Sequence, residues 1–370
     1  MSRTQLSQNR GQPMSDEFKI DQHKINYHVD RLHDWLHNKT VYPIYMEIAP
    51  TGACNHRCTF CAVDYIGYKV VFLDKDILKA RLTEMGRLGI KSIMYAGEGE
   101  PLLHKDLPEI IRHTRESRID VSITTNAVPM AKKWVLSTLK DVTWIKASIN
   151  AGTPETYAEI HKTKKDDFSK AVSNLETAVH FRNQKNLKCT IGAQMVLLPE
   201  NKREAVPLAR TMKSIGCDYL VIKPYSQHKK SLTRTYKNFD YQGSLDLKDE
   251  LEELNSPEFS VVFREKTILK LTENGHYYQK CFSTPFFWAY IMADGTVYGC
   301  SAYLLDDRFC YGNIIDNGFQ EIWEGEKRLR NIDFVEEELD ISNCRQNCRM
   351  DAVNRYLWDL KHPLEHVNFI

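Results

Sequence analysis

The stretch Cys54-Asn55-His56-Arg57-Cys58-Thr59-Phe60-Cys61 places three thiols within eight residues, at the spacing C-x3-C-x2-C. It follows an apolar run, 42–48, that has the character of a strand. A loop this compact can surround one small inorganic group. Ordinary 4Fe–4S clusters take four cysteine ligands, so three ligands from one loop leave one iron without a protein ligand. An open metal position is what a catalytic site needs to bind a substrate or cofactor.

This loop resembles the cluster loop of the radical S-adenosylmethionine (radical SAM) superfamily, including the aromatic Phe60 directly before the third cysteine. The resemblance implies a 4Fe–4S cluster on Cys54, Cys58 and Cys61, with S-adenosylmethionine (SAM) chelating the fourth iron. One electron then cleaves SAM, and the resulting 5′-deoxyadenosyl radical abstracts hydrogen from the substrate. A structural zinc loop is the alternative, but zinc prefers four ligands, usually in C-x2-4-C pairs.

Length, charge and cysteine content narrow the class of protein. The 370 residues suffice for about two or three domains of ~150 residues. A net charge of +1 leaves no broad basic field, so a nucleic-acid substrate is not favoured. No apolar run approaches the roughly 18–20 residues of a membrane span, and residues 1–18 lack the apolar core of a secretory signal. Ten cysteines in such a chain favour metal or redox chemistry in a reducing, cytoplasmic compartment.

Between residue 42 and about residue 225, short apolar runs alternate with longer amphipathic ones. The predicted strands are 43–49, 91–96, 120–125, 143–149, 189–197 and 218–223. The predicted helices are 74–88, 105–117, 130–139, 154–160, 168–182 and 201–215. Such β-then-α units indicate a parallel sheet with helices outside it, joined by right-handed crossovers. We therefore predict an α/β fold, a partial (β/α)6 TIM-like barrel, because a complete barrel needs about 250 residues. Radical SAM cores have this architecture.

Ligands of parallel α/β sheets bind at the carboxyl ends of the strands. The second predicted strand ends in a turn at 96–103, where Gly99, Glu100 and Pro101 resemble the Gly-Gly-Glu-Pro motif that holds the amino group of SAM. Glu98 stands where the first glycine of that motif would be, which puts only that backbone contact in doubt. The alternative is a Gly-Pro turn with a solvated carboxylate.

Small polar residues end the next strands and suit the hydroxyls of a ribose. They are Asn126 after the third strand, Ser148 and Asn150 after the fourth, and Gln194 inside the fifth. Members of the family often carry Thr-Asn-Gly and Ser-Leu/Ile-Asp/Asn at these points, so the resemblance implies contacts with SAM. Ordinary helix caps and turns are the alternative.

The sixth strand ends in Lys223-Pro224-Tyr225-Ser226-Gln227-His228. This end would lie over the substrate. Lys223, Tyr225 and His228 are titratable, and we predict that they carry out the acid–base steps. A polar surface loop is the alternative for each of them.

A second set of cysteines occupies the C-terminal part. Cys281 and Cys300 flank Asp294-Gly295, a hairpin signal between apolar runs. The pattern Cys281-x13-Gly295-x4-Cys300 resembles the twitch or SPASM extension of radical SAM enzymes, whose opening is C-x(9–15)-G-x4-C. The resemblance implies one auxiliary 4Fe–4S cluster, and zinc is again the alternative. The ligands we expect are Cys281, Cys300, Cys344 and Cys348, the last two on one face if that stretch is helical. Cys310 replaces one of them or is a bystander.

These features divide the chain into five predicted segments. They are a tail and helix (1–41), the radical SAM partial barrel (42–228), a linker with helices (229–278), the auxiliary cluster domain (279–350) and a closing helix and tail (351–370).

Three functional hypotheses follow. The first is a radical SAM oxidoreductase acting on a small polar metabolite such as a sugar, aminocyclitol or nucleoside, and reduced by a donor such as flavodoxin or ferredoxin. The N-terminal 40 residues are too short for an added leader-binding domain, which disfavours a peptide or protein side-chain maturase of the same superfamily. The second is a non-catalytic metal-binding or electron-transfer protein, which leaves the Gly99-Glu100-Pro101 turn unexplained. The third, an RNA-modifying radical enzyme, calls for a basic surface.

Overall fold

The computed structural model describes residues 22–131, 133–271 and 275–369, so the predicted tail at 1–18 lies outside the described residues. Within them, one sheet runs in the order β10-β9-β8-β1-β2-β3-β4-β5-β6-β7. Neighbours from β8 through β1 to β7 are parallel, whereas β8–β9 and β9–β10 are antiparallel. The strands are β1 (Tyr45–Ile48), β2 (Ser92–Tyr95), β3 (Asp120–Thr125), β4 (Trp144–Ser148), β5 (Thr190–Leu197), β6 (Tyr219–Pro224), β7 (Ser260–Phe263), β8 (Trp288–Ile291), β9 (Thr296–Tyr298) and β10 (Cys310–Asn313).

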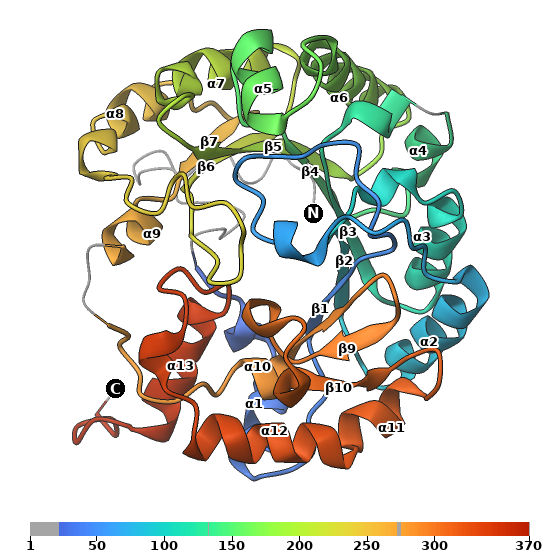
Figure 1. The fold of residues 1–370 in the computed structure, drawn as a ribbon, viewed down its shortest axis with the longest axis vertical. Helices are drawn as coiled ribbons and strands as arrows, with labels where there is room; N and C mark the ends of the chain where they lie inside the picture. The colour runs from blue at the N-terminus through green and yellow to red at the C-terminus, as the bar shows by residue number, and fades with distance from the viewer. Residues whose placement is uncertain (1–21, 132, 272–274, 370) are drawn as a thin grey trace.

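The helices follow the outside of this curved sheet, as Figure 1 shows for α2 through α8. They are α1 (Val29–Leu36), α2 (Lys75–Arg87), α3 (Leu107–Glu116), α4 (Lys133–Thr138), α5 (Pro154–His161), α6 (Asp166–Gln184), α7 (Ala205–Ser214), α8 (Leu247–Glu252), α9 (Glu265–Lys270), α10 (Thr284–Phe287), α11 (Phe319–Glu324), α12 (Glu326–Glu337) and α13 (Asp351–Lys361). In the described part of the chain, no helix has both the length and the apolar character needed to cross a bilayer.

The predicted partial barrel is confirmed, and all six β-then-α units are present in the expected order. Local signals explain the helix boundaries. In α2, the carboxylate of Asp74 accepts hydrogen bonds from the next turn (2.9 Å to the amides of Asp76 and Ile77), which caps the helix. The buried Leu78 and Leu82 lie one turn apart and face the sheet.

Two regions differ from the sequence expectations. The sequence pattern places 260–263 in a linker with helices, but this stretch forms β7 and extends the parallel sheet beside β6. Its apolar run is too short to be distinguished from a helix by periodicity alone. Cys344 and Cys348 lie in turns that follow the 3-10 turn Ile341–Asn343, so they do not share a helical face.

Each strand of the barrel alternates its side chains between two faces. In β4, Ile145 and Ala147 are buried in the main hydrophobic core beneath the helices. Lys146 and Ser148 therefore lie on the opposite, concave face, and both are half-buried. The concave face is where a substrate can approach the strand ends.

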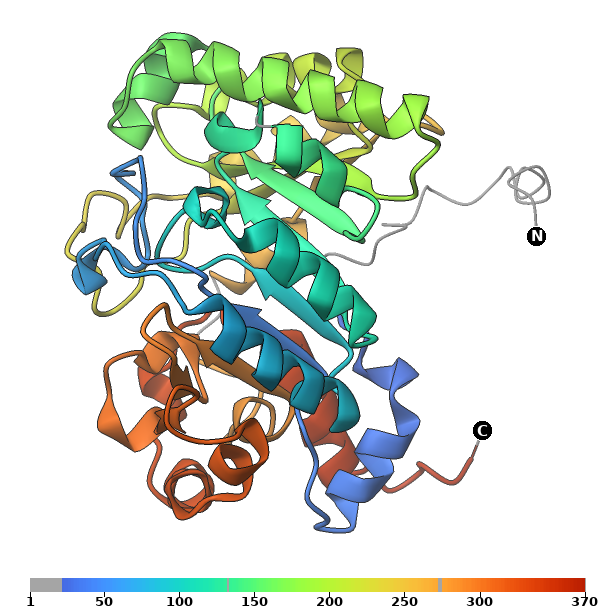
Figure 2. The same cartoon turned by 90° about the vertical axis from the view of Figure 1, so that its right-hand side faces the viewer.

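The C-terminal region continues the barrel sheet, because β8 pairs in parallel with β1 (Tyr45 opposite Trp288). The hairpin predicted around Asp294-Gly295 is present as β8–β9, and β10 adds a third strand. Figure 2 shows this orange and red part at one end of the sheet, beside the N-terminal strand. The closing helix predicted within 351–370 is α13.

Candidate active site at the carboxyl ends of the strands

The cysteine loop follows β1 and is fixed by backbone hydrogen bonds to the segment after β2 and to helix α5. The amide of Glu100, after β2, donates to the carbonyl of Ala53 (2.8 Å). The amide of Thr59 donates to the carbonyl of Ile160 in α5 (2.8 Å). The loop is therefore held over the barrel between the second and fourth strands.

The three thiols of this loop form one electrostatic group. Burial raises the pKa of Cys58 well above the usual value, and the neighbouring Cys61 and Cys54 raise it further. Burial also raises the pKa of Cys61, and that of Cys54 to about 12. Burial and the repulsion between neighbouring thiolates both oppose ionisation, so these three thiols do not ionise together without a cation among them. The donor set fits the predicted three-cysteine cluster, in which iron supplies that charge.

Two histidines that the sequence analysis did not single out, His56 and His161, lie close to Cys58. The Nδ1 atom of His161 is 3.2 Å from the sulfur of Cys58, and its Nε2 atom is 3.0 Å from the carbonyl of Ile149. Burial lowers the pKa of His161 to about 3, so its ring is neutral. The ring packs edge-on against Phe60 at 5.4 Å. His161 gave no sequence signal because it ends a short helix that is distant in the chain.

A mononuclear metal alternative is visible at the same place. One ligand atom from each of His56, Cys58 and His161 lies within 4.8 Å of the others. This group offers only three ligands, and zinc usually takes four. It also shares Cys58 with the three-thiol group, so the two sets exclude each other. The three-thiol group uses every cysteine of the loop, which favours the cluster.

Glu100 ties the ends of β2 and β3 together. Its carboxylate accepts hydrogen bonds from the hydroxyl of Thr125 (2.6 Å), the amide of Asn126 (2.7 Å) and the amide of Leu102 (3.1 Å). Burial is the main cause that raises its pKa, to about 6. Asn126 then donates its side-chain amide to Asn55 in the cysteine loop (2.7 Å). The predicted SAM-binding turn is thus physically joined to the cysteine loop.

Gly99 and Pro101 complete this turn. A side chain at Gly99 would lie 2.2 Å from the carbonyl oxygen of Thr51 and 2.6 Å from that of Ala53. Only glycine lets the turn approach the start of the cysteine loop this closely. Pro101 is buried and opens the 3-10 turn Pro101–Leu103.

Glu98, which departs from the family pattern, has a structural role here. Its buried carboxylate accepts hydrogen bonds from the hydroxyl of Tyr290 in β8 (2.8 Å) and from the amide of Ala293 (2.9 Å). Burial raises the pKa of Glu98. This residue therefore fastens the β2 end to the C-terminal hairpin.

The remaining predicted cofactor residues fall into two groups. Ser148 and Gln194 lie opposite each other on β4 and β5, and the amide of Gln194 donates to the hydroxyl of Ser148 (2.8 Å). Asn150 is fully buried in the left-handed region (φ +58°). Its carboxamide oxygen accepts from the amide of Val196 (2.7 Å), and its nitrogen is 3.3 Å from His161 Nε2. Asn150 thus shapes the loop that supports His161.

The end of β6 holds the three predicted acid–base residues. Lys223 is half-buried, and burial together with nearby cations lowers its pKa to about 7. Tyr225 is buried, which raises its pKa. His228 is buried, and burial and the charge of Arg345 lower its pKa to about 4. Because Nδ1 of His228 accepts from the amide of Lys230 (3.1 Å), its Nε2 faces the carbonyl of Ser301 (3.4 Å) as the donor.

The second cysteine set is gathered from three segments: Cys281 before β8, Cys300 after β9, and the stretch from Cys344 to Cys348. Burial raises the pKa of Cys300 well above its usual value, with further contributions from Cys348, Cys281 and Cys344. Burial also raises the pKa of Cys348 to about 12, again with Cys281 and Cys344 contributing. These four thiols match the predicted auxiliary ligand set, and their coupling fits a cationic metal centre.

Cys310 stands apart from this group. It lies in β10 opposite Tyr298, and its pKa is raised mainly by burial, whereas other cysteines are among the main causes for Cys300 and Cys348. Its sulfur is only half-buried beside the strand pair. The geometry therefore favours the bystander role left open by the sequence.

Residues 226–231 connect the two cysteine sets. The hydroxyl of Ser231 donates to the carbonyl of Cys61 (3.2 Å). The guanidinium of Arg345, next to Cys344, donates to the carbonyl of Ser226 (3.0 Å). A hollow beside this segment is lined by Gln227, Lys229, Gly275, His276, Ser342, Cys344, Arg345 and Gln346.

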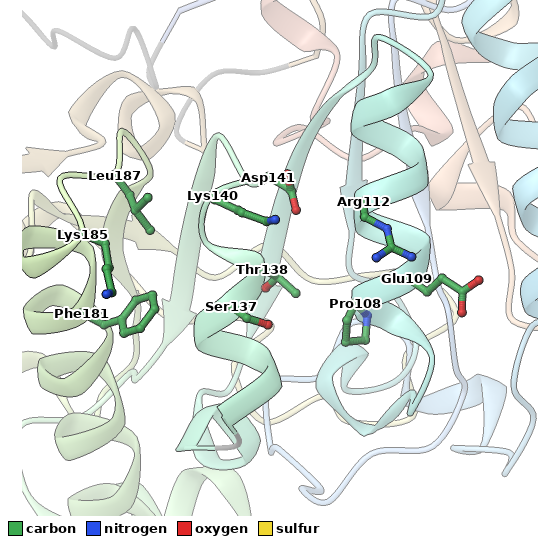
Figure 3. Close-up of a pocket in the computed structure, with 10 residues that line it drawn as sticks. All are labelled: Pro108, Glu109, Arg112, Ser137, Thr138, Lys140, Asp141, Phe181, Lys185 and Leu187. Carbon is green, nitrogen blue, oxygen red and sulfur yellow. The ribbon is translucent and has the colours of Figure 1, made fainter.

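A larger hollow lies elsewhere, on the outer helical surface. Figure 3 shows its lining side chains, which come from α3, α4, α6 and the segments that follow them. None of the predicted site residues lines it. The chemistry therefore gathers at the strand ends and not at this surface.

Two family models match the chain. The radical SAM superfamily model matches residues 48–212, and the model of an iron–sulfur cluster-binding domain, SPASM, matches residues 281–349.

Curated relatives include GTP 3′,8-cyclase of Paenarthrobacter nicotinovorans, 31% identical over 121 residues, which are 31% of this chain and 34% of that protein. The probable GTP 3′,8-cyclase of Metallosphaera sedula is 30% identical over 215 residues, 56% of this chain and 63% of that protein. The matched part is thus less than two thirds of either relative.

Solved structures with the same fold include Streptococcus suis SuiB bound to S-adenosylmethionine. It has a TM-score of 0.63 at 17% identity, covering 81% of this chain and 69% of that chain. The structure of native anSMEcpe with bound AdoMet and the Cp18Cys peptide has a TM-score of 0.58 at 19% identity, covering 85% of this chain and 88% of that chain. At these identities the likeness concerns the fold.

Proposed function

Because the chain belongs to the radical SAM superfamily and carries a SPASM-type auxiliary cluster domain, we propose that it oxidises a small polar metabolite held inside the barrel. Its cofactors are a three-cysteine 4Fe–4S cluster, SAM and an auxiliary 4Fe–4S cluster. When bound, these groups supply a 5′-deoxyadenosyl radical that abstracts hydrogen and a second redox centre that assists the oxidation. Cys54, Cys58 and Cys61 would hold the first cluster. Cys281, Cys300, Cys344 and Cys348 would hold the second.

One observation carries this proposal: residues 226–231 contact both cysteine sets. The Ser231 bond to Cys61 and the Arg345 bond to Ser226 place the carboxyl end of β6 between the two sets. The side chain of Tyr65, just after the cysteine loop, stacks on His228 at 5.1 Å. A substrate at this strand end would therefore meet both redox centres.

The residues proposed for SAM surround the cysteine loop. Glu100 already accepts three hydrogen bonds, and a carboxylate has about four acceptor sites. One site thus remains for the amino group of SAM. Ser148 and Gln194 lie on the concave face, which suits contacts with ribose hydroxyls, and Asn126 holds the loop beside them. Asn150 supports the site indirectly, through its bond to Val196.

Among the acid–base candidates, Lys223 is best suited to exchange a proton near neutral pH, because its pKa is about 7. Tyr225 has a raised pKa and is suited to donate a hydrogen bond. His228 contacts backbone groups with both ring nitrogens, so we assign it a positioning role between the β6 end and Ser301.

The names of the curated relatives favour a small substrate, because these relatives are named for GTP, a small polar molecule. An external electron donor such as flavodoxin or ferredoxin belongs to this proposal, as does a cytoplasmic location.

The test is anaerobic reconstitution with iron and sulfide, followed by incubation with SAM, a reductant and deuterated candidate metabolites. We expect 5′-deoxyadenosine to form and to carry deuterium from the true substrate. The Cys58→Ala variant should form none. A matched control is Cys217→Ala, since Cys217 is buried in the core away from both cysteine sets. Absence of 5′-deoxyadenosine from the loaded wild-type protein, or zinc in place of iron, would contradict the proposal.

A further inference from the structure

Arg345 lies between two of the expected auxiliary ligands, in the stretch Cys344-Arg345-Gln346-Asn347-Cys348. Its side chain is half-buried, and its Nη2 atom donates to the carbonyl of Ser226 (3.0 Å). Its Nε atom is buried and has no hydrogen-bond partner in the described part of the chain, where no carboxylate pairs with the guanidinium either. An arginine is always charged in a protein. The stretch therefore carries a positive charge that no acid among the described residues neutralises.

The other charged residues just after this stretch are already paired. Arg349 forms an ion pair with the buried Glu47 of β1. Asp351, which is also buried, pairs with Lys270 and Arg355. Burial of an unpaired charge is costly, so a cation that no acid balances indicates another source of negative charge close by.

The auxiliary thiols are negative groups of this kind once they are ionised. Burial lowers the pKa of Arg345, and the charges of Cys348 and Cys300 act in the opposite direction. A second side chain of the same turn is also unsatisfied, because both polar atoms of the Asn347 carboxamide are buried without a partner among the residues that the structure describes. Unpaired buried donors are rare in native proteins, and each calls for an explanation such as a bound ion. Two of them between two metal ligands point to the metal centre that those ligands would hold.

Hydroxyl groups lie beside two sulfur atoms of the auxiliary set. The sulfur of Cys281 is 3.4 Å from the hydroxyls of Ser283 and Thr284, and the sulfur of Cys344 is 3.6 Å from the hydroxyl of Tyr303. A thiolate has no hydrogen to donate, so these hydroxyls donate to the sulfurs when the thiols bind iron. Net charge and hydrogen bonds to the sulfurs both set the reduction potential of an iron–sulfur cluster. These surroundings favour the reduced state, which carries one more negative charge.

The cation beside the cysteine loop is placed differently. Arg57 is exposed, and its Nη1 atom donates to the backbone carbonyls of Cys54 (2.8 Å) and His56 (2.7 Å). Water and salt screen an exposed charge, whereas a buried charge acts through a less polar medium. We therefore expect the stronger effect of an arginine on a cluster at the auxiliary set.

We propose that the guanidinium of Arg345 compensates the negative charge of the auxiliary cluster and raises its reduction potential, so that this cluster accepts an electron from the substrate radical. Oxidation of that radical removes one electron and one proton. The cluster takes the electron and passes it to an oxidised carrier of the flavodoxin or ferredoxin type, and the acid–base group at the end of β6 takes the proton. This inference rests on the proposed function, because it makes the auxiliary cluster the electron acceptor.

The experiment uses the full-length Cys58→Ala protein, reconstituted with iron and sulfide, so that the auxiliary cluster is measured without the first one. Its midpoint potential is obtained by a redox titration followed by electron paramagnetic resonance. We expect Arg345→Met to lower this potential by at least about 59 mV, which is a tenfold change in the equilibrium constant of a one-electron reduction. Arg345→Lys keeps the charge and should lower the potential much less. Arg330→Met, on the exposed surface of α12, is the matched control and should leave it unchanged.

Three outcomes would overturn the inference: an unchanged potential in Arg345→Met, an equal shift in Arg345→Met and Arg345→Lys, or an equal shift in Arg330→Met. The second would assign the effect to packing, because charge is kept in only one of the two variants. Iron content shows whether each variant holds its cluster, and Arg345→Gln, which is also neutral, replaces Arg345→Met if that variant does not.

The potential is measured without SAM or substrate, so it is independent of the proposed activity. Formation of 5′-deoxyadenosine is followed separately, in the protein that keeps Cys58. A lowered potential in Arg345→Met together with no 5′-deoxyadenosine would contradict the proposed function and would still support the effect of Arg345 on the cluster.

Discussion

The two cysteine sets achieve a similar arrangement by different means. Cys54, Cys58 and Cys61 come from a single loop after β1, whereas the auxiliary four come from segments spread over residues 281–348. In both sets, the pKa of buried thiols is raised by burial and then by other cysteines of the same set. A set of cysteine ligands can therefore lie within one loop or be assembled by the sheet, and the assembled set depends on the hairpin β8–β9.

The largest expected effect on activity comes from the cysteine set of the single loop, Cys54, Cys58 and Cys61. Replacing Cys58 by Ala removes one of only three ligands, so we expect 5′-deoxyadenosine formation to fall by at least about a thousandfold. Iron should fall to about four atoms per chain, those of the auxiliary cluster. Iron analysis and chromatography of the reaction products check both values. If the variant lost all its iron, the two sets would not be independent.

The next largest effect is expected from the auxiliary cysteine set, which the sheet assembles from separate segments. We expect Cys348→Ala to lose the auxiliary cluster, which leaves about half of the iron and ends substrate oxidation while SAM cleavage continues. Cys310→Ala is the comparison, because Cys310 lies in β10 and its pKa is raised mainly by burial, and this variant should keep the full iron content. Equal iron loss in the two variants would place Cys310 among the ligands.

A smaller effect is expected where the two regions are joined. Glu98→Ala leaves the hydroxyl of Tyr290 and the amide of Ala293 without their buried acceptor. We expect the free energy of unfolding to fall by about 2–4 kcal/mol, with Glu98→Gln losing less because its amide oxygen still accepts from Ala293. Chemical denaturation measures both. An unchanged stability in Glu98→Ala would show that the hairpin is held to β2 by other contacts.

The smallest effect concerns the charges beside the segment that links the two sets. The folded-state pKa of Lys223, about 7, is below the unfolded value of about 10.4. The unfolded chain therefore binds more protons between pH 7 and pH 10.4, and this lysine destabilises the fold most at the acidic end of that window.

We accordingly expect Lys223→Met to be more stable than the wild type by about 1–3 kcal/mol at pH 7, with the difference shrinking as the pH rises to 9. The groups that face this amine are Lys146, Arg264 and Arg345. Parallel denaturation at several pH values tests the sign. A difference that grows with pH would mean that Lys223 is paired in the folded protein.

Most of the barrel could be predicted from the sequence. The six strands and their helices could be recognised because short apolar runs alternate regularly with longer amphipathic ones. In α2, for example, the apolar residues Leu78 and Leu82 stand at helical spacing. β7 was missed because four residues are too few to show a period, and its strand conformation depends on pairing with β6. The pairing of β8 with β1 joins residues more than two hundred apart, and no local signal marks it.

The candidate site also has one part that could be recognised from the sequence and another part that depends on the fold. The cysteine triplet, the Gly99-Glu100-Pro101 turn and the auxiliary cysteines could be recognised without a structure, because spacing along one loop or one hairpin is a covalent property of the chain. The contact of His161 with Cys58 and the bond between Glu98 and Tyr290 depend on the fold, and so does the position of Lys223 near Lys146, Arg264 and Arg345. The physical reason is that burial and electrostatic coupling depend on distance in space, and the sheet brings together side chains that the sequence keeps far apart.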